Sequence, residues 1–263
     1  YTPNPCILCN RYIKFPVLLE EAIKTGADMI STGHYARVVK GPDGGVVLKA
    51  GIDRSKDQSY VLYALGMEEI KRLTLPLGGL TKKEVRETAS RLGLPAADRE
   101  ESQEICFAGG RNYAEFVGAF TSCPSEGPIM DKTGKMLCVH KGVYRYTVGQ
   151  RKGLSVSNPC PLYVTKINVA ENSVIVGDKD EAMSKEFIVS DINWLIPRTG
   201  SFRAEVKVRS MMKAQPASVS FETADKDFVK VVFDSPQWAP APGQSAVFYD
   251  GDTVIGGGII ARD

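Results

Sequence analysis

The sequence lacks an apolar run of the roughly 18–20 residues needed to cross a bilayer, and we find no secretory signal pattern, so we expect no membrane segment. It also lacks a charge excess, because the formal net charge is only +2. Overall charge therefore does not indicate a nucleic-acid-binding protein, and such a surface would have to come from local clustering. With 263 residues, of which 43% are hydrophobic, the chain can form two or three domains.

Cysteine and histidine are scarce. Six scattered cysteines are too few for a disulfide-stapled secreted domain, which favours a reducing, cytoplasmic setting. Cys6 and Cys9 form the one Cys-x-x-Cys pair, and the two histidines, His34 and His140, stand alone. A structural zinc site normally needs four ligands, so this pattern gives it little support.

The cysteine pair lies in "TPNPCILCN", residues 2–10, directly before a predicted helix. Half of a metal site, a redox pair and a loop that presents a reactive thiol all fit this stretch, and so do two small buried hydrophobic residues. Cys9 precedes Asn10, the expected helix cap, and the helix dipole with Arg11 and Lys14 would favour a thiolate there. An ordinary thiol–disulfide oxidoreductase is disfavoured, because no thioredoxin-like βαβ pattern surrounds the pair.

The first half of the sequence has helical periodicity. A helix is expected to end at Gly26, and a strand to run into a loop at Gly33–His34. The turn "GPDGG" predicts a hairpin tip, and Thr81 with Glu84 predicts a capping box. The expected helices cover residues 10–26, 56–65, 81–93 and 111–120.

From about residue 125 the pattern changes to short alternating strands. Residues 161–178 predict a hairpin around Glu171–Asn172, and regularly spaced strands after residue 186 predict a small β-barrel or sandwich. The fold class is therefore α/β plus β. We expect three parts: residues 1–121, the C-terminal part of an α/β nucleotide-binding domain; residues 122–185, a β-rich connector; and residues 186–263, a C-terminal β-barrel.

Seven segments occur together in one order along nearly the whole chain: "TPNPCILCN", "STGHYARV", "DRSKDQSYVLYAL", "ICFAGGR", "YTVGQRKGL", "PLYVTKI" and "PGQSAVFYDGDTVIGGGII". Together they resemble the tRNA-specific 2-thiouridylases of bacteria. The resemblance implies an adenine-nucleotide alpha-hydrolase-like, Rossmann-like N-terminal domain. It also implies an enzyme that replaces the C2 oxygen of the wobble uridine in tRNA with sulfur. In this family ATP, with Mg²⁺, adenylates that oxygen, and a persulfide-donating carrier or cysteine desulfurase supplies the sulfur.

The resemblance also assigns roles to residues. Cys106 matches the persulfide carrier and Cys9 the second catalytic cysteine, a nucleophile; a core position is the alternative for Cys106. Gly33 matches an ATP contact. The segment that touches the target base matches Asn4, Pro5 and Cys6. Residues that contact tRNA match His34, Lys56, Asp57, Gln58, Arg209, Ser210 and Gln244. For His34 the alternative is a satisfied structural histidine, and for residues 56–58 a plain charged helix start.

Basic residues cluster between positions 131 and 153, with Asp131 as the one acidic residue among them. Tyr144 and Tyr146 interleave with these cations, and basic with aromatic side chains suit an RNA surface. A solvated sheet face is the alternative. The cations are Lys132, Lys135, Lys141, Arg145, Arg151 and Lys152.

The chain departs from the family at two points. Many relatives carry Asp where this chain has Cys6, so Cys6, Cys9 and Cys106 could form a three-thiolate ligand set for an iron–sulfur cluster. The family's Ser-Gly-Gly-x-Asp-Ser pyrophosphate loop does not occur in the sequence, which starts at Tyr1 inside a motif. We expect that an N-terminal part is missing and that these residues alone are inactive. The alternatives are a non-catalytic tRNA-binding relative and a metal-binding or iron–sulfur protein.

Overall fold

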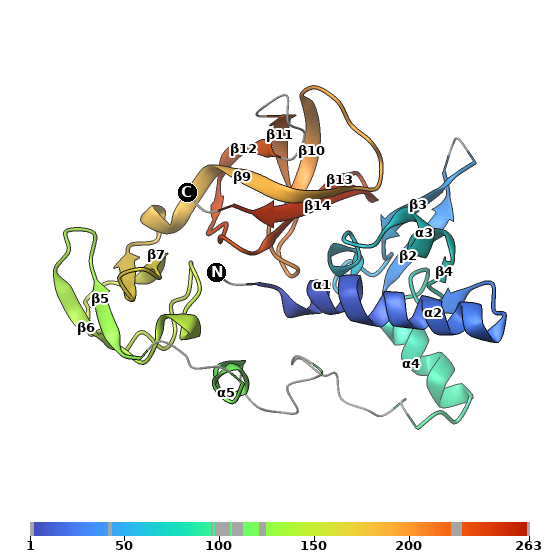
Figure 1. Ribbon diagram of the computed structural model, residues 1–263, viewed down its shortest axis with the longest axis horizontal. Coiled ribbons are helices and arrows are strands. Elements are labelled where there is room, and N and C mark those ends of the chain that lie inside the picture. Colours follow the sequence, from blue (N-terminus) through green and yellow to red (C-terminus); the bar gives the residue numbers. More distant parts are fainter. Residues whose placement is uncertain are drawn as a thin grey trace.

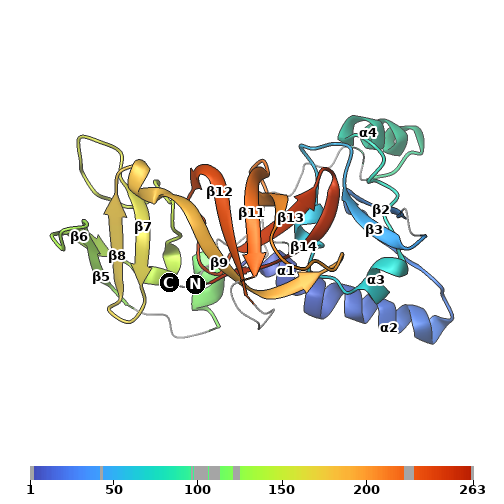
Figure 2. The ribbon, with the colours of Figure 1, turned by 90° about the horizontal axis from the view of Figure 1, so that it is seen from above.

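The computed structural model describes residues 3–41, 44–95, 97, 106, 113–120, 125–221 and 228–261. Viewed from above, a four-stranded sheet lies at one end, a barrel in the middle and a helical part at the other end (Figure 2). The barrel comes last in the sequence but lies between the other two parts.

The first helical run is longer than predicted. It consists of α1 (Pro5–Cys9), a π-helical turn η1 (Asn10–Lys14) and α2 (Phe15–Thr25) (Figure 1). Asn4 caps it, since its side-chain oxygen accepts the backbone N–H of Cys6 at 3.1 Å. Pro5 fits the first helical position, where no partner for its nitrogen is required. The run ends at Gly26 (φ +77°), as predicted.

The prediction that Asn10 caps this helix is therefore wrong. Asn10 lies inside the helical run, is buried, and donates from its side chain to the carbonyl of Val61 at 3.0 Å. A capping residue needs its side chain for its own helix, whereas this one bonds an element 51 positions away.

The rest of the first part is mostly as expected. The hairpin is confirmed, with β2 (Ala36–Lys40) antiparallel to β3 (Val46–Ala50). The capping box is confirmed too, because Thr81 and Glu84 bond reciprocally at the start of α4. The remaining elements are β1 (Ile30–Ser31) parallel to β4 (Leu73–Thr74), α3 (Met67–Lys71), α4 (Lys82–Arg91) and α5 (Tyr113–Gly118).

The predicted helix over residues 56–65 is wrong. Only η2 (Ser59–Val61) is helical there, a single 3₁₀ turn. Carbonyls that a helix would use internally accept side-chain amides from other elements instead: Val61 from Asn10, and Tyr63 and Leu65 from Asn193. These long-range bonds, and burial of most of the segment, outweigh local helix propensity.

The middle part is a four-stranded sheet in the order β6-β5-β8-β7. Its β7–β8 hairpin confirms the predicted one. The strands are β5 (Gly127–Met130), β6 (Met136–His140), β7 (Tyr163–Asn168) and β8 (Ser173–Gly177), with the 3₁₀ turns η3 (Val143–Arg145) and η4 (Asp180–Ala182). Its core includes Ile129, Val164 and Val174.

The last part is a six-stranded barrel, which confirms the predicted fold. Its strands follow the order β13-β10-β11-β12-β9-β14, and pairing of β13 with β14 closes the ring. Alternate residues such as Ala217, Val219, Val231 and Phe233 are buried inside it. The strands are β9 (Met183–Trp194), β10 (Phe202–Lys207), β11 (Gln215–Phe221), β12 (Val229–Trp238), β13 (Ser245–Asp250) and β14 (Thr253–Ile260).

The helical part and the barrel share one hydrophobic core. Tyr60, Tyr63 and Leu65 belong to the same buried cluster as Val247 and Tyr249 of β13. At the edge, β3 continues the barrel sheet through β14. This continuity fixes the first helical run relative to the barrel. No helix among the described residues is long and apolar enough to cross a membrane.

Candidate functional site

The cysteine pair lies on the first turns of the helical run. Cys6 is exposed and Cys9 is partly buried. The predicted placement of Cys9 at the helix N-terminus is wrong, because the helix begins at Pro5 and Cys6 stands in its first turn. The dipole argument therefore no longer applies to Cys9.

Cys106 is exposed and lies near this pair. Burial raises the pKa of the Cys6 thiol, negative charge on Cys106 and on Cys9 raises it further, and Lys14 opposes them. Charges act this way only over short distances, so Cys106 lies near Cys6, on the helix turn that also carries Cys9. The interaction with Cys106 is stronger than that with Cys9.

The iron–sulfur hypothesis receives no geometric support. In the described ranges, no group of three or more His, Cys, Asp or Glu side chains is arranged to hold a metal ion. The three-thiolate ligand set of Cys6, Cys9 and Cys106 therefore stays a hypothesis.

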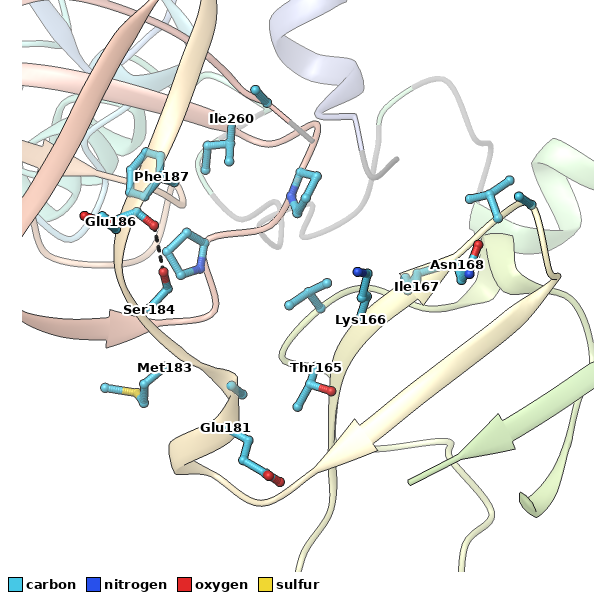
Figure 3. A pocket seen from close by; sticks show the side chains of 17 residues that line it. Thr165, Lys166, Ile167, Asn168, Glu181, Met183, Ser184, Glu186, Phe187 and Ile260 are labelled. Carbon is cyan, nitrogen blue, oxygen red and sulfur yellow. Dashed lines mark hydrogen bonds between the residues drawn. The ribbon is translucent and has the colours of Figure 1, made fainter. Parts of the chain in front are cut away.

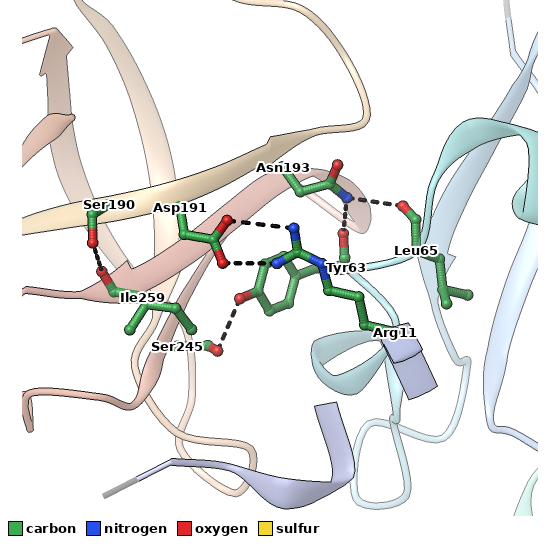
Figure 4. Close-up of polar contacts among 8 residues, drawn as sticks. All are labelled: Arg11, Tyr63, Leu65, Ser190, Asp191, Asn193, Ser245 and Ile259. Atoms are coloured by element: carbon green, nitrogen blue, oxygen red, sulfur yellow. Dashed lines mark hydrogen bonds and ion pairs between the residues drawn. The ribbon is translucent and has the colours of Figure 1, made fainter. Parts of the chain in front are cut away.

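Two contacts hold the helix directly after Cys9. Asn10 bonds the carbonyl of Val61, and Arg11 forms an ion pair with Asp191 of β9, Nη1 to Oδ2 at 2.7 Å (Figure 4). Asp191 comes from the barrel, so the cysteine-bearing helix is joined to both neighbouring elements.

Gly33 and His34 follow β1, close to the first helical run. A Cβ at Gly33 would make only an ordinary contact with Leu77 at 3.6 Å, so packing within the chain does not demand glycine there. His34 shares a 2.9 Å hydrogen bond with Thr32, and its ring lies 5.7 Å from that of Phe15. Burial lowers the pKa of His34 to about 4, so it is neutral near pH 7.

Asp57 and Gln58 take part in internal bonds. The Asp57 carboxylate accepts the N–H groups of Gly51 and Ser59, at 3.1 and 3.0 Å, and pairs with Lys207 Nζ at 3.6 Å. Gln58 Oε1 accepts the N–H of Tyr35. These bonds fix residues 57–65 against the hairpin and the barrel. Lys56 beside them is half-buried.

Arg209 joins two parts of the fold. Its guanidinium donates to the carbonyl of Val148 in the middle part at 2.7 Å and to that of Ala239 in the barrel at 3.1 Å. The Tyr60 hydroxyl donates to the carbonyl of Ser245, the residue after Gln244. Arg209 therefore lies where the middle part meets the barrel, and Ser210, next to it in the chain, is half-buried.

One residue of the predicted basic and aromatic surface is buried, and its cations are exposed. Tyr146 is buried against His140, with ring centroids 5.6 Å apart, so its predicted place on the surface is wrong. Arg145 stacks on Tyr144 at 5.2 Å, and Lys132 pairs with Glu181. All six cations are exposed: Lys132, which is paired, and Lys135, Lys141, Arg145, Arg151 and Lys152.

A cavity of about 460 Å³ lies between the middle part and the barrel. Figure 3 shows Thr165 and Lys166 of β7 facing Met183, Ser184 and Phe187 of β9 across it. None of the five cysteines that the structure describes lines this cavity. Strand β9 therefore runs from the cavity to Asp191 beside the cysteine-bearing helix.

Sequence reasoning missed the residues that hold the site together. Asp191 and Asn193 lie in β9, a strand that mixes polar and apolar residues, and no local pattern marks them. Asn10 was noticed in the sequence but was assigned the wrong role, because an Asn before an apolar helix is typical of a helix cap. Lys207 alternates with barrel residues as a surface lysine would, yet it is buried.

Comparison with known protein families divides the chain into the same three parts. Family models match residues 1–110 (tRNA methyl transferase HUP domain), 115–178 (tRNA methyl transferase PRC-barrel domain) and 184–260 (aminomethyltransferase beta-barrel domain). The tRNA-specific 2-thiouridylase MnmA of Carboxydothermus hydrogenoformans is 47% identical over 99% of this chain and 72% of its own length. The chain belongs to the tRNA-specific 2-thiouridylase family.

Other members are equally similar. The Geobacter metallireducens protein is 43% identical over 98% of this chain and 70% of its own, and the Syntrophotalea carbinolica protein 44% over 99% and 74%. The chain thus spans about 70% of its relatives' length. The expected family and its three-part fold, with a partial HUP domain first, are confirmed.

Proposed function

We propose that this chain carries the sulfur-transfer part of a tRNA 2-thiouridylase, with Cys106 as persulfide carrier and Cys9 as nucleophile. The observation that supports it is the place of the exposed Cys106 near Cys6, on the helix turn that also carries Cys9. Cys106 is exposed and open to a sulfur donor. A persulfide-donating carrier or cysteine desulfurase is the partner that this chemistry requires.

The proposed transfer has two steps. The terminal sulfur of a Cys106 persulfide, as its anion, attacks C2 of an activated wobble uridine, and the activated oxygen leaves with its electron pair. Cys9 thiolate then attacks Sγ of Cys106, and the broken sulfur–sulfur bond leaves its electron pair on the sulfur now bonded to C2. The ring regains a proton at nitrogen, giving 2-thiouridine. A Cys9–Cys106 disulfide remains, so a thiol reductant must return two electrons before the next cycle.

The base is proposed to lie against Asn4, Pro5 and Cys6, because the proline-bounded helix start is rigid and adjoins the thiols. A wobble base splayed from its loop can enter such a pocket. The exposed cations Lys135, Lys141 and Arg145 offer a surface to the tRNA phosphates. Lys56, Ser210 and Gln244 keep their proposed contacts with tRNA. The side chains of His34, Asp57, Gln58 and Arg209 form hydrogen bonds within the protein. We therefore propose that these four residues position the tRNA-binding surface.

Activation of the base uses ATP, with Mg²⁺, in this proposal, and Gly33 is its one contact assigned on this chain. A phosphate cradle needs backbone N–H groups at a helix start. The Ser-Gly-Gly-x-Asp-Ser pattern does not occur in the sequence, and the described residues offer no other such cradle around Gly33. We therefore expect these residues alone to carry sulfur without activating the base. ATP-dependent thiolation of tRNA by this chain alone would contradict that.

The test loads the chain with sulfur from a cysteine desulfurase and cysteine, and maps persulfides by peptide mass spectrometry. We expect Cys106 to gain one sulfur and Cys106→Ser to gain none in that peptide. Cys160→Ser is the matched control, since Cys160 is also exposed and lies in the middle part. Equal loading of Cys106 and Cys160 would contradict the proposed role.

A second candidate is a tRNA-binding relative that performs no chemistry. It predicts tRNA binding with no specific loading of Cys106. The same experiment separates the two.

A further inference from the structure

We propose that Asp191, a barrel residue, is a positioning residue that sets the place of Cys9 by holding the helix through Arg11. The inference rests on the proposed role of Cys9 in sulfur transfer. Asp191 touches no reacting atom, so it acts only through Arg11.

The ion pair has the geometry of a fork. Arg11 Nη1 lies 2.7 Å from Asp191 Oδ2, and Nη2 lies 3.4 Å from Oδ1 (Figure 4). The Arg11 side chain is 30% exposed and that of Asp191 56%, so water screens the pair only in part. Two parallel bonds fix the orientation of the guanidinium as well as its distance.

The backbone at Asp191 is shaped to present this carboxylate. Asp191 has φ +48°, in the left-handed region that few residues other than glycine and Asn or Asp adopt. It lies where the pairing of β9 with β14 shifts register, between the Ser190–Ile259 and Asn193–Gly257 pairs. Such bulges turn a side chain away from its regular direction. Here the turned side chain meets the helix instead of following the strand's alternation.

The helix that carries Cys9, the segment around Val61 and strand β9 are each bonded to the other two. The two residues after Cys9 are anchored to different elements: Asn10 to Val61, and Arg11 to β9. Strand β9 also holds the segment that Asn10 binds, because Asn193 Nδ2 donates to the carbonyls of Tyr63 at 2.6 Å and Leu65 at 2.8 Å. Helix, segment and strand therefore constrain one another, and Arg11–Asp191 is an ion pair that joins the helix to the barrel beside the shared hydrophobic core.

The π-helical turn makes this link important for Cys9. Residues 10–14 form i→i+5 bonds, as in the Phe15 N–H to Asn10 carbonyl bond, and such turns are less regular than α-helix. Cys9 directly precedes this turn, so its sulfur depends on how the turn is held. Losing the Arg11 anchor leaves Asn10 as the sole polar anchor next to Cys9 among the described contacts.

The experiment measures the alkylation rate of Cys9 by iodoacetamide in the full chain, by peptide mass spectrometry, with exposed Cys160 as internal reference. In Asp191→Asn we expect the partly buried Cys9 to react about two- to fivefold faster, the size expected of a partly exposed ion pair. The matched control is Asp234→Asn. It breaks the comparable ion pair between Arg203 Nη2 and Asp234 Oδ2 (2.6 Å), which joins two strands of the barrel on its outer surface. It should leave the Cys9 rate unchanged.

Two further measurements separate positioning from general loosening. Arg11→Gln, which removes the same ion pair from the helix side and leaves the backbone at Asp191 unchanged, should speed Cys9 alkylation as much as Asp191→Asn does. Raising NaCl to about 1 M should speed Cys9 alkylation in the native chain and not in Asp191→Asn, since salt screens the pair. Equal Cys9 alkylation rates in the native chain and in Asp191→Asn would overturn the proposal. Equal acceleration of Cys9 alkylation in Asp191→Asn and in the control Asp234→Asn would overturn it too. Failure of Cys106 to take up sulfur would instead contradict the proposed function and leave these rates unaffected.

Discussion

Lys207 of barrel strand β10 lies 3.6 Å from the carboxylate of Asp57, and both side chains are nearly buried, at 11% and 6% exposed. Burial lowers the pKa of Lys207, while Asp57 acts in the opposite direction. The pair crosses from the barrel to the segment that packs under the cysteine-bearing helix. It is therefore a structural link between the two parts.

Breaking this pair should destabilise the whole chain. Asp57→Ala removes the partner of Lys207 and of the N–H groups of Gly51 and Ser59, so we expect a loss of about 3–5 kcal/mol in unfolding free energy. Lys230→Ala breaks the more exposed pair with Glu186 and should cost at most about 1 kcal/mol. Urea unfolding measures both. Similar losses would show that the Asp57 pair is not a structural link.

His34 should make stability depend on pH. Its pKa is lowered to about 4 in the folded state from an ordinary value of 6.5, so the unfolded chain binds the proton more tightly. The stability due to neutral His34 is complete above about pH 6.5 and is lost as pH falls toward 4. The loss is on the order of 3 kcal/mol at most.

The measurement is the pH titration of the His34 ring by NMR, with His34→Gln to assign the signal. Unfolding free energies at pH 7 and pH 5 should differ less in His34→Gln than in the native chain. A midpoint near 6.5 for His34 in the folded chain would contradict the burial seen here.

Arg209 should matter for the junction between the middle part and the barrel. Arg209→Ala removes the donors to the carbonyls of Val148 and Ala239, and we expect a loss of about 1–3 kcal/mol. Limited proteolysis should cut the variant faster between these two parts. Arg203→Ala, within the barrel, is the control and should leave that cleavage rate unchanged; equal rates in Arg209→Ala and the native chain would contradict the linking role.

Local patterns predicted much of this fold. The barrel strands alternate buried and exposed residues, and the Thr81–Glu84 capping box depends only on neighbours three positions apart. The hairpin at residues 36–50 follows from glycines between two β-rich runs. Each of these features is decided by residues close in the sequence, which is why reading the sequence alone finds them.

The site depended on contacts that no local pattern records. Asn10 binds Val61, 51 positions away, so Asn10 lies inside the helix and does not cap it. Asn193 binds Tyr63, 130 positions away, in the segment for which a helix was predicted. Arg11 and Asp191 are 180 positions apart. The cysteines were found from the sequence because their motif is local, whereas the residues that position them were not.

The most direct test of the sulfur-transfer account is the disulfide that Cys9 forms when it displaces the carried sulfur from Cys106. The chain is loaded with sulfur at Cys106, and without an acceptor base Cys9 thiolate attacks Sγ of Cys106, so that hydrosulfide leaves with the electron pair of the broken sulfur–sulfur bond. The resulting disulfide is mapped by peptide mass spectrometry. The account predicts a Cys9–Cys106 disulfide that is absent in Cys9→Ser and retained in Cys160→Ser. A Cys106 that releases its sulfur without bonding Cys9, or that bonds Cys160 instead, would contradict the account.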